Sequence, residues 1–144
     1  MSIEAAKFNW DAIPVKTGAT ADPAPGAQLA AITVPAGRRW LFCEISVTLT
    51  CDATVANRWV NLGIKTNGTH YGFYSPAGLT VTASQSKQQS FVAGSFIVTA
   101  GTQYGMHFPL TELPAGAVIE LTVNALQAGD DMGAARYFYK EVPA

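Results

Sequence analysis

The chain has 144 residues, a net charge of −1, and only 13% charged residues. Soluble domains average about 25% charged residues, so this composition argues against nucleic acid or an anionic membrane as a partner. It favours a surface that is partly covered by other protein chains, because buried interfaces are poor in charge. One domain of this length needs no disulfide or metal to hold its core.

The first 27 residues differ from the rest, and we expect them to form an extended arm ahead of a domain of residues 28–144. Residues 17–27 are rich in Pro, Gly, Ala and Thr, a composition that predicts no packed element. Before them come Phe8, Trp10 and Ile13, which a fully exposed arm has little reason to carry. Either these side chains fold back onto their own domain, or they dock on a neighbouring subunit. Because the N-terminus lacks the apolar run of a signal peptide, we expect assembly in the cytoplasm.

Alternation of apolar and polar residues with period 2 predicts β-strands along the domain. The longest alternating run is residues 39–50, where one face would hold Leu41, Cys43, Ile45, Val47 and Leu49. Further strands are expected at residues 58–66, 96–98, 104–108, 118–124 and 134–142. The spacing of these strands predicts an all-β fold, a jelly-roll-like antiparallel β-sandwich of about eight strands.

Two kinds of turn signal separate these runs. Pro-Ala-Gly occurs at residues 35–37, 76–78 and 114–116, which predicts a type I turn followed by a glycine with positive φ. Asn67-Gly68 lies between two strand runs and predicts a tight β-hairpin.

Metal and disulfide sites have little support. Cys43 and Cys51 are eight residues apart in the sequence, about 26 Å along one strand at ~3.3 Å per residue, and therefore out of disulfide reach. We expect Cys43 to be a small buried side chain and Cys51 a free thiol near a turn. His70 and His107 have no second ligand at metal-binding spacing, so neither predicts a zinc site.

The acidic residues suggest no reaction. Asp130 and Asp131 share a turn, and Glu112 and Glu120 flank another. A calcium loop needs more oxygen ligands, and a glycosidase-like carboxylate pair has no positive support. With no nucleophile or phosphate-binding motif either, the chain is predicted not to be an enzyme and to hold no cofactor or metal.

Arginine and aromatic side chains give the only local binding character. Arg38 precedes Arg39 and Trp40, and Arg58 precedes Trp59; if the two strands form a hairpin, the tryptophans could share a face. The alternative is that the tryptophans are core anchors and the arginines lie at the sheet rim. Exposed aromatics could also stack on sugars, and the candidates for this are Trp59, Tyr71, Phe73 and Tyr74.

Four stretches in order resemble small structural proteins of tailed bacteriophages and prophages. They are ITVPAGRRWLF (32–42), SVTLTCDATVANRWV (46–60), LPAGAVI (113–119) and QAGD (127–130). In that group a VPAGKRW strand entry, a TDATVGNR loop and an LPAG turn recur in this order. Cys51 and Ala56 depart from the loop pattern, as do residues 131–133 from a Trp-containing strand start.

The resemblance implies a virion structural protein, and in particular a head decoration (cement) protein. Such a protein would bind the major capsid protein on the outer capsid surface, typically as a homotrimer. With the arm and the arginines, this gives a candidate interface of Phe8, Trp10, Ile13, Arg38 and Arg58. The alternative is a tail, baseplate or host-receptor module that binds glycans.

Overall fold

The computed structural model describes residues 9–75, 80–94, 99–100 and 103–144. Phe8, the turn predicted at residues 76–78 and the strand predicted at residues 96–98 lie outside these residues. The elements are the 3-10 helix η1 (Trp10–Ala12) and the strands β1 (Lys16–Ala19), β2 (Ile32–Thr33), β3 (Arg38–Thr50), β4 (Trp59–Thr66), β5 (Thr69–Tyr74), β6 (Ser86–Ala93), β7 (Thr99–Ala100), β8 (Gln103–Phe108), β9 (Thr111–Leu113), β10 (Val118–Asn124), β11 (Asp131–Met132) and β12 (Arg136–Pro143).

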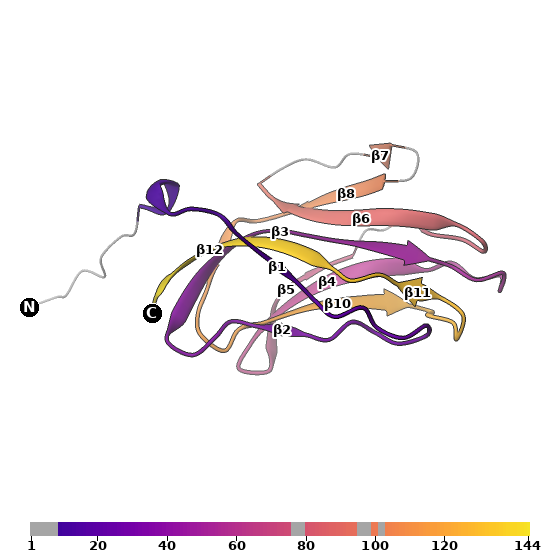
Figure 1. Cartoon of the computed structure of the whole chain (residues 1–144), viewed down its shortest axis with the longest axis horizontal. Helices are drawn as coiled ribbons and strands as arrows, with labels where there is room; N and C mark the ends of the chain where they lie inside the picture. The colour runs from indigo at the N-terminus through magenta and orange to yellow at the C-terminus, as the bar shows by residue number, and fades with distance from the viewer. Residues whose placement is uncertain (1–8, 76–79, 95–98, 101–102) are drawn as a thin grey trace, which may run out of the picture.

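The strands form two sheets that face each other. The larger sheet has the order β1-β12-β3-β6-β8-β7, with β9 and β11 also paired to β3, and the smaller has the order β2-β10-β4-β5. Figure 1 shows the larger sheet above the smaller one. The all-β, sandwich-like prediction is confirmed, and the jelly-roll connectivity stays a prediction. The expectation of antiparallel pairing throughout is wrong at one place, because β6 and β8 are parallel.

Strand β3 is the centre of the larger sheet and carries a β-bulge. Phe138 pairs with Glu44 while Tyr139 pairs with Phe42, so Cys43 is an extra residue on β3. A bulge reverses which residues face the core. The prediction that odd-numbered residues face inward is therefore correct from Ile45 to Leu49. Before the bulge, Leu41 is buried at 7% exposure but lies outside the core cluster, whereas its even-numbered neighbour Phe42 is in that cluster at 1% exposure.

Aromatic side chains link the two sheets through the core. Phe108 of β8 is fully buried. Its ring centroid lies 5.6 Å from that of Phe42 on β3 and 6.0 Å from that of Tyr74 on β5. Aliphatic side chains of β3, β4 and β10 fill the remaining space: Ile45, Val47, Leu49, Val60, Leu62, Ile64, Ile119, Leu121 and Val123.

The predicted turns are confirmed where the structure describes them. Gly37 has φ 71° and Gly116 has φ 81°, each at the end of a Pro-Ala-Gly turn. Asn67 (φ 51°) and Gly68 (φ 75°) connect β4 to β5. Positive φ at both central residues is the type I′ hairpin turn.

The N-terminal arm is more ordered than its composition predicts. β1 pairs with β12 in antiparallel register, with Gly18 opposite Tyr137. A Cβ atom at Gly18 would overlap the Tyr137 ring, so the absence of a side chain allows the strand to lie against this ring. The expectation that residues 17–27 contain no packed element is therefore wrong for residues 17–19.

Candidate interaction surface

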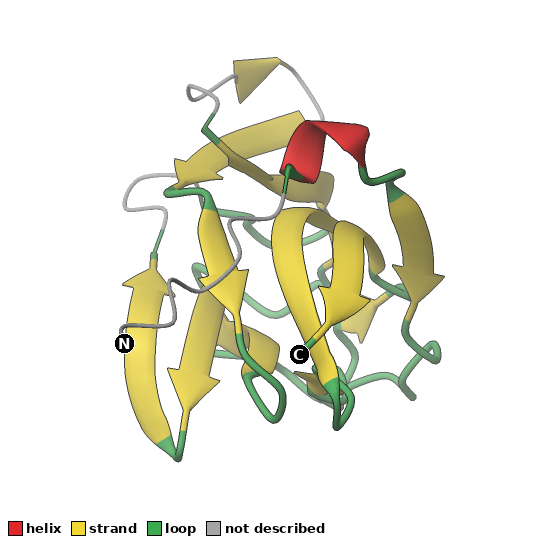
Figure 2. Cartoon of the chain, turned by 90° about the vertical axis from the view of Figure 1, so that its left-hand side faces the viewer, coloured by secondary structure: helices red, strands yellow, loops and turns green. Residues whose placement is uncertain are grey.

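The first described residues fold back onto their own domain. Trp10 Nε1 donates to Glu112 Oε1 at 2.6 Å, and Lys140 Nζ donates to the Trp10 carbonyl at 2.7 Å. Trp10 and Ile13 are half-buried, and η1 buries no residue. Figure 2 shows η1 as a red turn on the outside of the strands. Of the two interpretations of the arm, the contact with its own domain is the one seen for Trp10.

A band of polar contacts surrounds this turn. Arg39 Nη1 lies 3.7 Å from Glu112 Oε2, and both side chains are partly exposed. Arg38, at the start of β3, is exposed. We call Trp10, Arg39, Glu112 and Lys140 the N-terminal rim. Its ion pair is at the surface, where such pairs contribute at most about 1 kcal/mol to stability.

A second polar contact fixes β1. Lys16 Nζ lies 2.7 Å from Glu141 Oε1, and Trp40 Nε1 donates to Glu141 Oε2 at 2.8 Å. The hydrogen bond from Lys16, followed by that from Trp40, holds the pKa of Glu141 below its ordinary value. The carboxylate of Glu141 therefore ties the N-terminal segment to a buried tryptophan.

Arg58 does not lie on the surface, and its assignment to the interface is wrong. Its side chain is 0% exposed. Nε and Nη2 donate to the two carboxylate oxygens of Asp130 at 2.9 Å each, and Nη2 also donates to Asp52 Oδ1 at 2.7 Å. Nη1 donates to the carbonyls of Thr54 at 2.7 Å and Ala56 at 3.0 Å. All five guanidinium donors are used, as burial of an arginine requires.

Asp130, the partner of Arg58, is also fully buried. Its carboxylate accepts from the backbone N–H groups of Asp52 at 2.9 Å and Gln127 at 2.8 Å. Burial alone would raise the pKa of Asp130, but the hydrogen bonds from Gln127, Arg58 and Asp52 together bring it below its ordinary value. This site holds two loops together, with Arg58 and Asp130 fully buried and the Asp52 side chain 25% exposed.

We expect this carboxylate to make the fold acid-sensitive. Its folded-state pKa lies below the unfolded value of about 3.9, so its contribution is complete above about pH 5 and is lost as the pH falls through the folded pKa. Urea unfolding measured from pH 6 to pH 2.5 should show this decline, and Asp130→Asn should flatten it while lowering stability at pH 6. The matched control is Asp131→Asn, an exposed neighbour. If the free energy of unfolding falls equally with decreasing pH in both variants, the prediction is contradicted.

The four stretches that carry the phage resemblance meet in pairs. The Val34 N–H donates to the Ala117 carbonyl and the Gly116 N–H to the Val34 carbonyl, both at 2.9 Å, which joins the first stretch to the third. Arg58 and Asp130 join the second stretch to the fourth. These contacts fix the turns of the sandwich.

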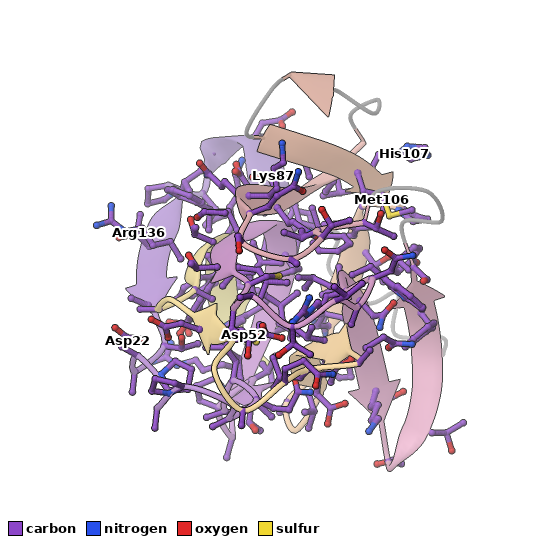
Figure 3. The ribbon with its side chains drawn as sticks, turned by 90° about the vertical axis from the view of Figure 1, so that its right-hand side faces the viewer. Asp22, Asp52, Lys87, Met106, His107 and Arg136 are labelled. Carbon is purple, nitrogen blue, oxygen red and sulfur yellow. The ribbon has the colours of Figure 1, made fainter. Side chains whose placement is uncertain are left out.

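The other candidates for chemistry do not converge. Glu112 lies on β9 of the larger sheet, whereas Glu120 lies on β10 of the smaller sheet and pairs with Lys65 at 2.9 Å. Both cysteines are free, and it is Cys51 rather than Cys43 that is buried. No group of three or more His, Cys, Asp or Glu side chains within the described residues could hold a metal. His107 is exposed on β8, where Figure 3 shows it projecting outward.

The aromatic candidates for sugar stacking are mostly covered. Trp40 and Trp59 belong to different sheets, so their strands do not form the hairpin on which a shared face depended, and Trp40 is in the core, as the alternative interpretation expects. Tyr74 is half-buried beside Phe108. Phe73 on β5 is 55% exposed, and the Tyr71 side chain lies outside what the structure describes. Among the candidates whose side chains the structure describes, Phe73 therefore has the most accessible ring.

An open groove of about 390 Å³ lies on the flank between β1 and β2. Trp40, Tyr137 and Tyr139 line it together with small residues, and none of the lining residues is charged. The rings of Trp40 and Tyr139 stack on each other at 3.9 Å between centroids, and Trp40 is only 3% exposed. The Trp40 ring therefore offers no open face for a sugar.

Within the described residues, no helix has the length and apolarity that a membrane span requires. No protein-family model and no curated protein sequence matches this chain.

Proposed function

We propose that this chain is a structural protein of a bacteriophage virion, a decoration protein on the outer surface of the head. It binds the major capsid protein, stabilises contacts between capsid subunits, and forms a homotrimer. It performs this role as a binding protein, with no cofactor, nucleic acid or membrane, after assembly in the host cytoplasm.

The observation that carries the proposal is the pairing of the four phage-like stretches. Each stretch alone has a sequence that is common in turns. In the fold, however, Val34 of the first stretch bonds to Ala117 of the third, and Arg58 of the second stretch bonds to Asp130 of the fourth. The four stretches are therefore linked by contacts between segments that are distant in the sequence. Such contacts support kinship with the phage structural proteins more strongly than isolated turns would.

Composition supports the same role. With 13% charged residues, the surface loses little charge hydration when another protein covers it. Contact with a capsid lattice is then stabilised mainly by apolar burial, at about 25 cal/mol per Å². Trp10 and Ile13, both half-buried in the free chain, still have apolar surface to contribute to such a contact, and Arg38 lies exposed at the start of β3.

Co-sedimentation with phage heads that lack this protein tests the proposal. We expect saturation at a fixed stoichiometry, and at least tenfold weaker binding for the double variant Trp10→Ala, Ile13→Ala. Phe73→Ala, on the far edge of the smaller sheet, is the control and should bind as the unmodified chain does. Absence of co-sedimentation for the unmodified chain would overturn the capsid proposal.

The alternative, a tail, baseplate or receptor-binding module, depends on one observation, the exposed ring of Phe73. Under that alternative a glycan array gives a signal that Phe73→Ala removes. Silence on the array together with full occupancy on heads excludes it.

A further inference from the structure

The N-terminal segment, residues 9–20, is attached to the domain without burying any side chain completely. No residue from 9 to 28 is buried, and Leu29, at 9% exposure, is the first that is. The main packing partner of β1 is β12. Since apolar burial supplies most of the stability of a fold, detaching this segment exposes little of the core.

The contacts that hold the segment are nevertheless specific. β1 pairs with β12 over four residues in fixed register. Lys16 bonds to Glu141 at 2.7 Å and Trp10 to Glu112 at 2.6 Å. The Thr20 N–H donates to the Ala135 carbonyl, and the Ala135 N–H donates to the Thr20 hydroxyl oxygen, both at 2.9 Å. Every copy of the chain therefore presents the same acceptor surface on β9 and β12 for this segment.

The connection after the segment has the character of a hinge. Residues 21–25 read Ala-Asp-Pro-Ala-Pro, and each proline restricts the residue before it to extended conformations. At the far end of the hinge, Gly26 has φ +76°, and its N–H donates to the Asp130 carbonyl at 2.7 Å. Figure 3 shows Asp22 and Arg136 on the same flank of the molecule. The connection ends in a turn in which the Ala27 N–H donates to the Ala24 carbonyl at 3.0 Å. A change of direction in the residues before this turn would point the segment away from its own domain.

The segment also carries apolar surface that stays exposed to solvent when it packs on its own domain. Val15 is 54% exposed, and Trp10 and Ile13 are half-buried. Exchange with a second copy would keep every contact described above, because the acceptor is identical, and would bring these side chains near a second surface. Exchange of an identical element is a low-cost route to a closed oligomer.

We propose that residues 9–20 exchange between copies of this chain, so that β1 of one copy pairs with β12 of another. The exchange supplies the contact between subunits of the homo-oligomer, and it needs only the protein itself. It rests on the homo-oligomer of the proposed function but not on capsid binding, since neither the segment's acceptor nor the test involves phage heads.

Disulfide trapping with single-cysteine variants tests the exchange. Thr17 and Phe138 are register partners, and partners in antiparallel strands lie within disulfide reach. Thr17→Cys and Phe138→Cys are made in separate chains that carry Cys43→Ser, and the two are refolded together and oxidised. Cys51 is kept because it is buried and burial raises its thiol pKa, which slows its oxidation.

Exchange gives a covalent pair joined between positions 17 and 138, at least tenfold more abundant than with the control pair Thr17→Cys and Ser46→Cys. Ser46 is on β3 and does not pair with β1. The double variant with Thr17→Cys and Phe138→Cys in one chain detects pairing of β1 with its own β12. If this double variant forms a disulfide within one chain while the two single variants refolded together form no covalent dimer, the proposal is overturned. Ala19→Cys with Arg136→Cys, the next register partners but one, repeats the test if the first pair folds poorly.

Shortening the hinge gives a second readout. Deletion of residues 22–25 joins Ala21 directly to Gly26, although Thr20 is bonded to Ala135 and Gly26 to Asp130. We expect the shortened chain to be unable to keep both contacts within one domain, so light scattering should show a complete shift to oligomer. A folded monomer with an unpaired N-terminal segment would overturn the exchange. If head binding fails while trapping succeeds, only the capsid proposal falls, and the reverse result removes only the exchange.

Discussion

Arg58→Ala should lower the free energy of unfolding by about 3–5 kcal/mol, because it leaves the buried Asp130 carboxylate without its partner. The loss also leaves the Thr54 and Ala56 carbonyls without the donor that now reaches them. Domains of this kind have only about 5–15 kcal/mol in total, so the variant should unfold at much lower urea concentration.

Arg58→Lys separates charge from geometry. An ammonium has three donors and cannot hold both Asp130 oxygens as a planar guanidinium does, so we expect this variant also to be clearly destabilised. Arg38→Ala is the matched control, because Arg38 is exposed, and it should change stability by no more than about 0.5 kcal/mol. If Arg58→Ala unfolds like the Arg38 variant, the buried ion pair does not hold the fold.

Phe108→Ala should cost about 3–5 kcal/mol, the range for removing a buried phenylalanine. Its ring packs between Phe42 of the larger sheet and Tyr74 of the smaller, so the cavity would open between the two sheets. Urea unfolding followed by far-UV circular dichroism measures this loss.

Two variants sharpen the Phe108 test. Phe108→Leu keeps most of the volume and should cost less than about 1.5 kcal/mol. Phe73→Ala removes the same ring from a side chain that is 55% exposed, and should cost about 1 kcal/mol or less. Equal losses for Phe73→Ala and Phe108→Ala would show that Phe108 does not bridge the sheets, and would also argue against the parallel placement of β8.

Strands with an alternating pattern were predictable from the sequence. Residues 118–124 coincide with β10, and residues 39–50 differ from β3 by one residue. Strand β6 was missed, since Lys87, Gln88 and Gln89 give no apolar alternation. Its place becomes understandable only in the fold, where Gln89 is 2% exposed and its Oε1 accepts from the Val60 N–H at 3.3 Å. A contact between sheets leaves no periodic signal in one segment.

The interaction surface was less predictable than the strands. Trp10 was found because an aromatic residue stands out in a polar arm, but its partner Glu112 lies 102 residues away. The Arg-Trp pair at residues 58–59 favours a surface position for Arg58, because arginine is usually exposed. The burial of Arg58 depends on two carboxylates, Asp52 and Asp130, that the fold brings together around it. Asp130 lies 72 residues away in the sequence, so no local pattern indicates this pairing.

The pairing of β3 sets constraints on how this protein is made. β3 ends at Thr50, and its nearest strand partner along the chain begins 36 residues later, at Ser86, while the others come later still. A nascent chain that has emerged only to residue 80 therefore exposes a 13-residue strand with both edges unpaired, a template for aggregation. Pairings this distant in sequence form slowly. We therefore expect the soluble yield in cells to depend more on translation speed and chaperone supply than on the stability of the finished fold.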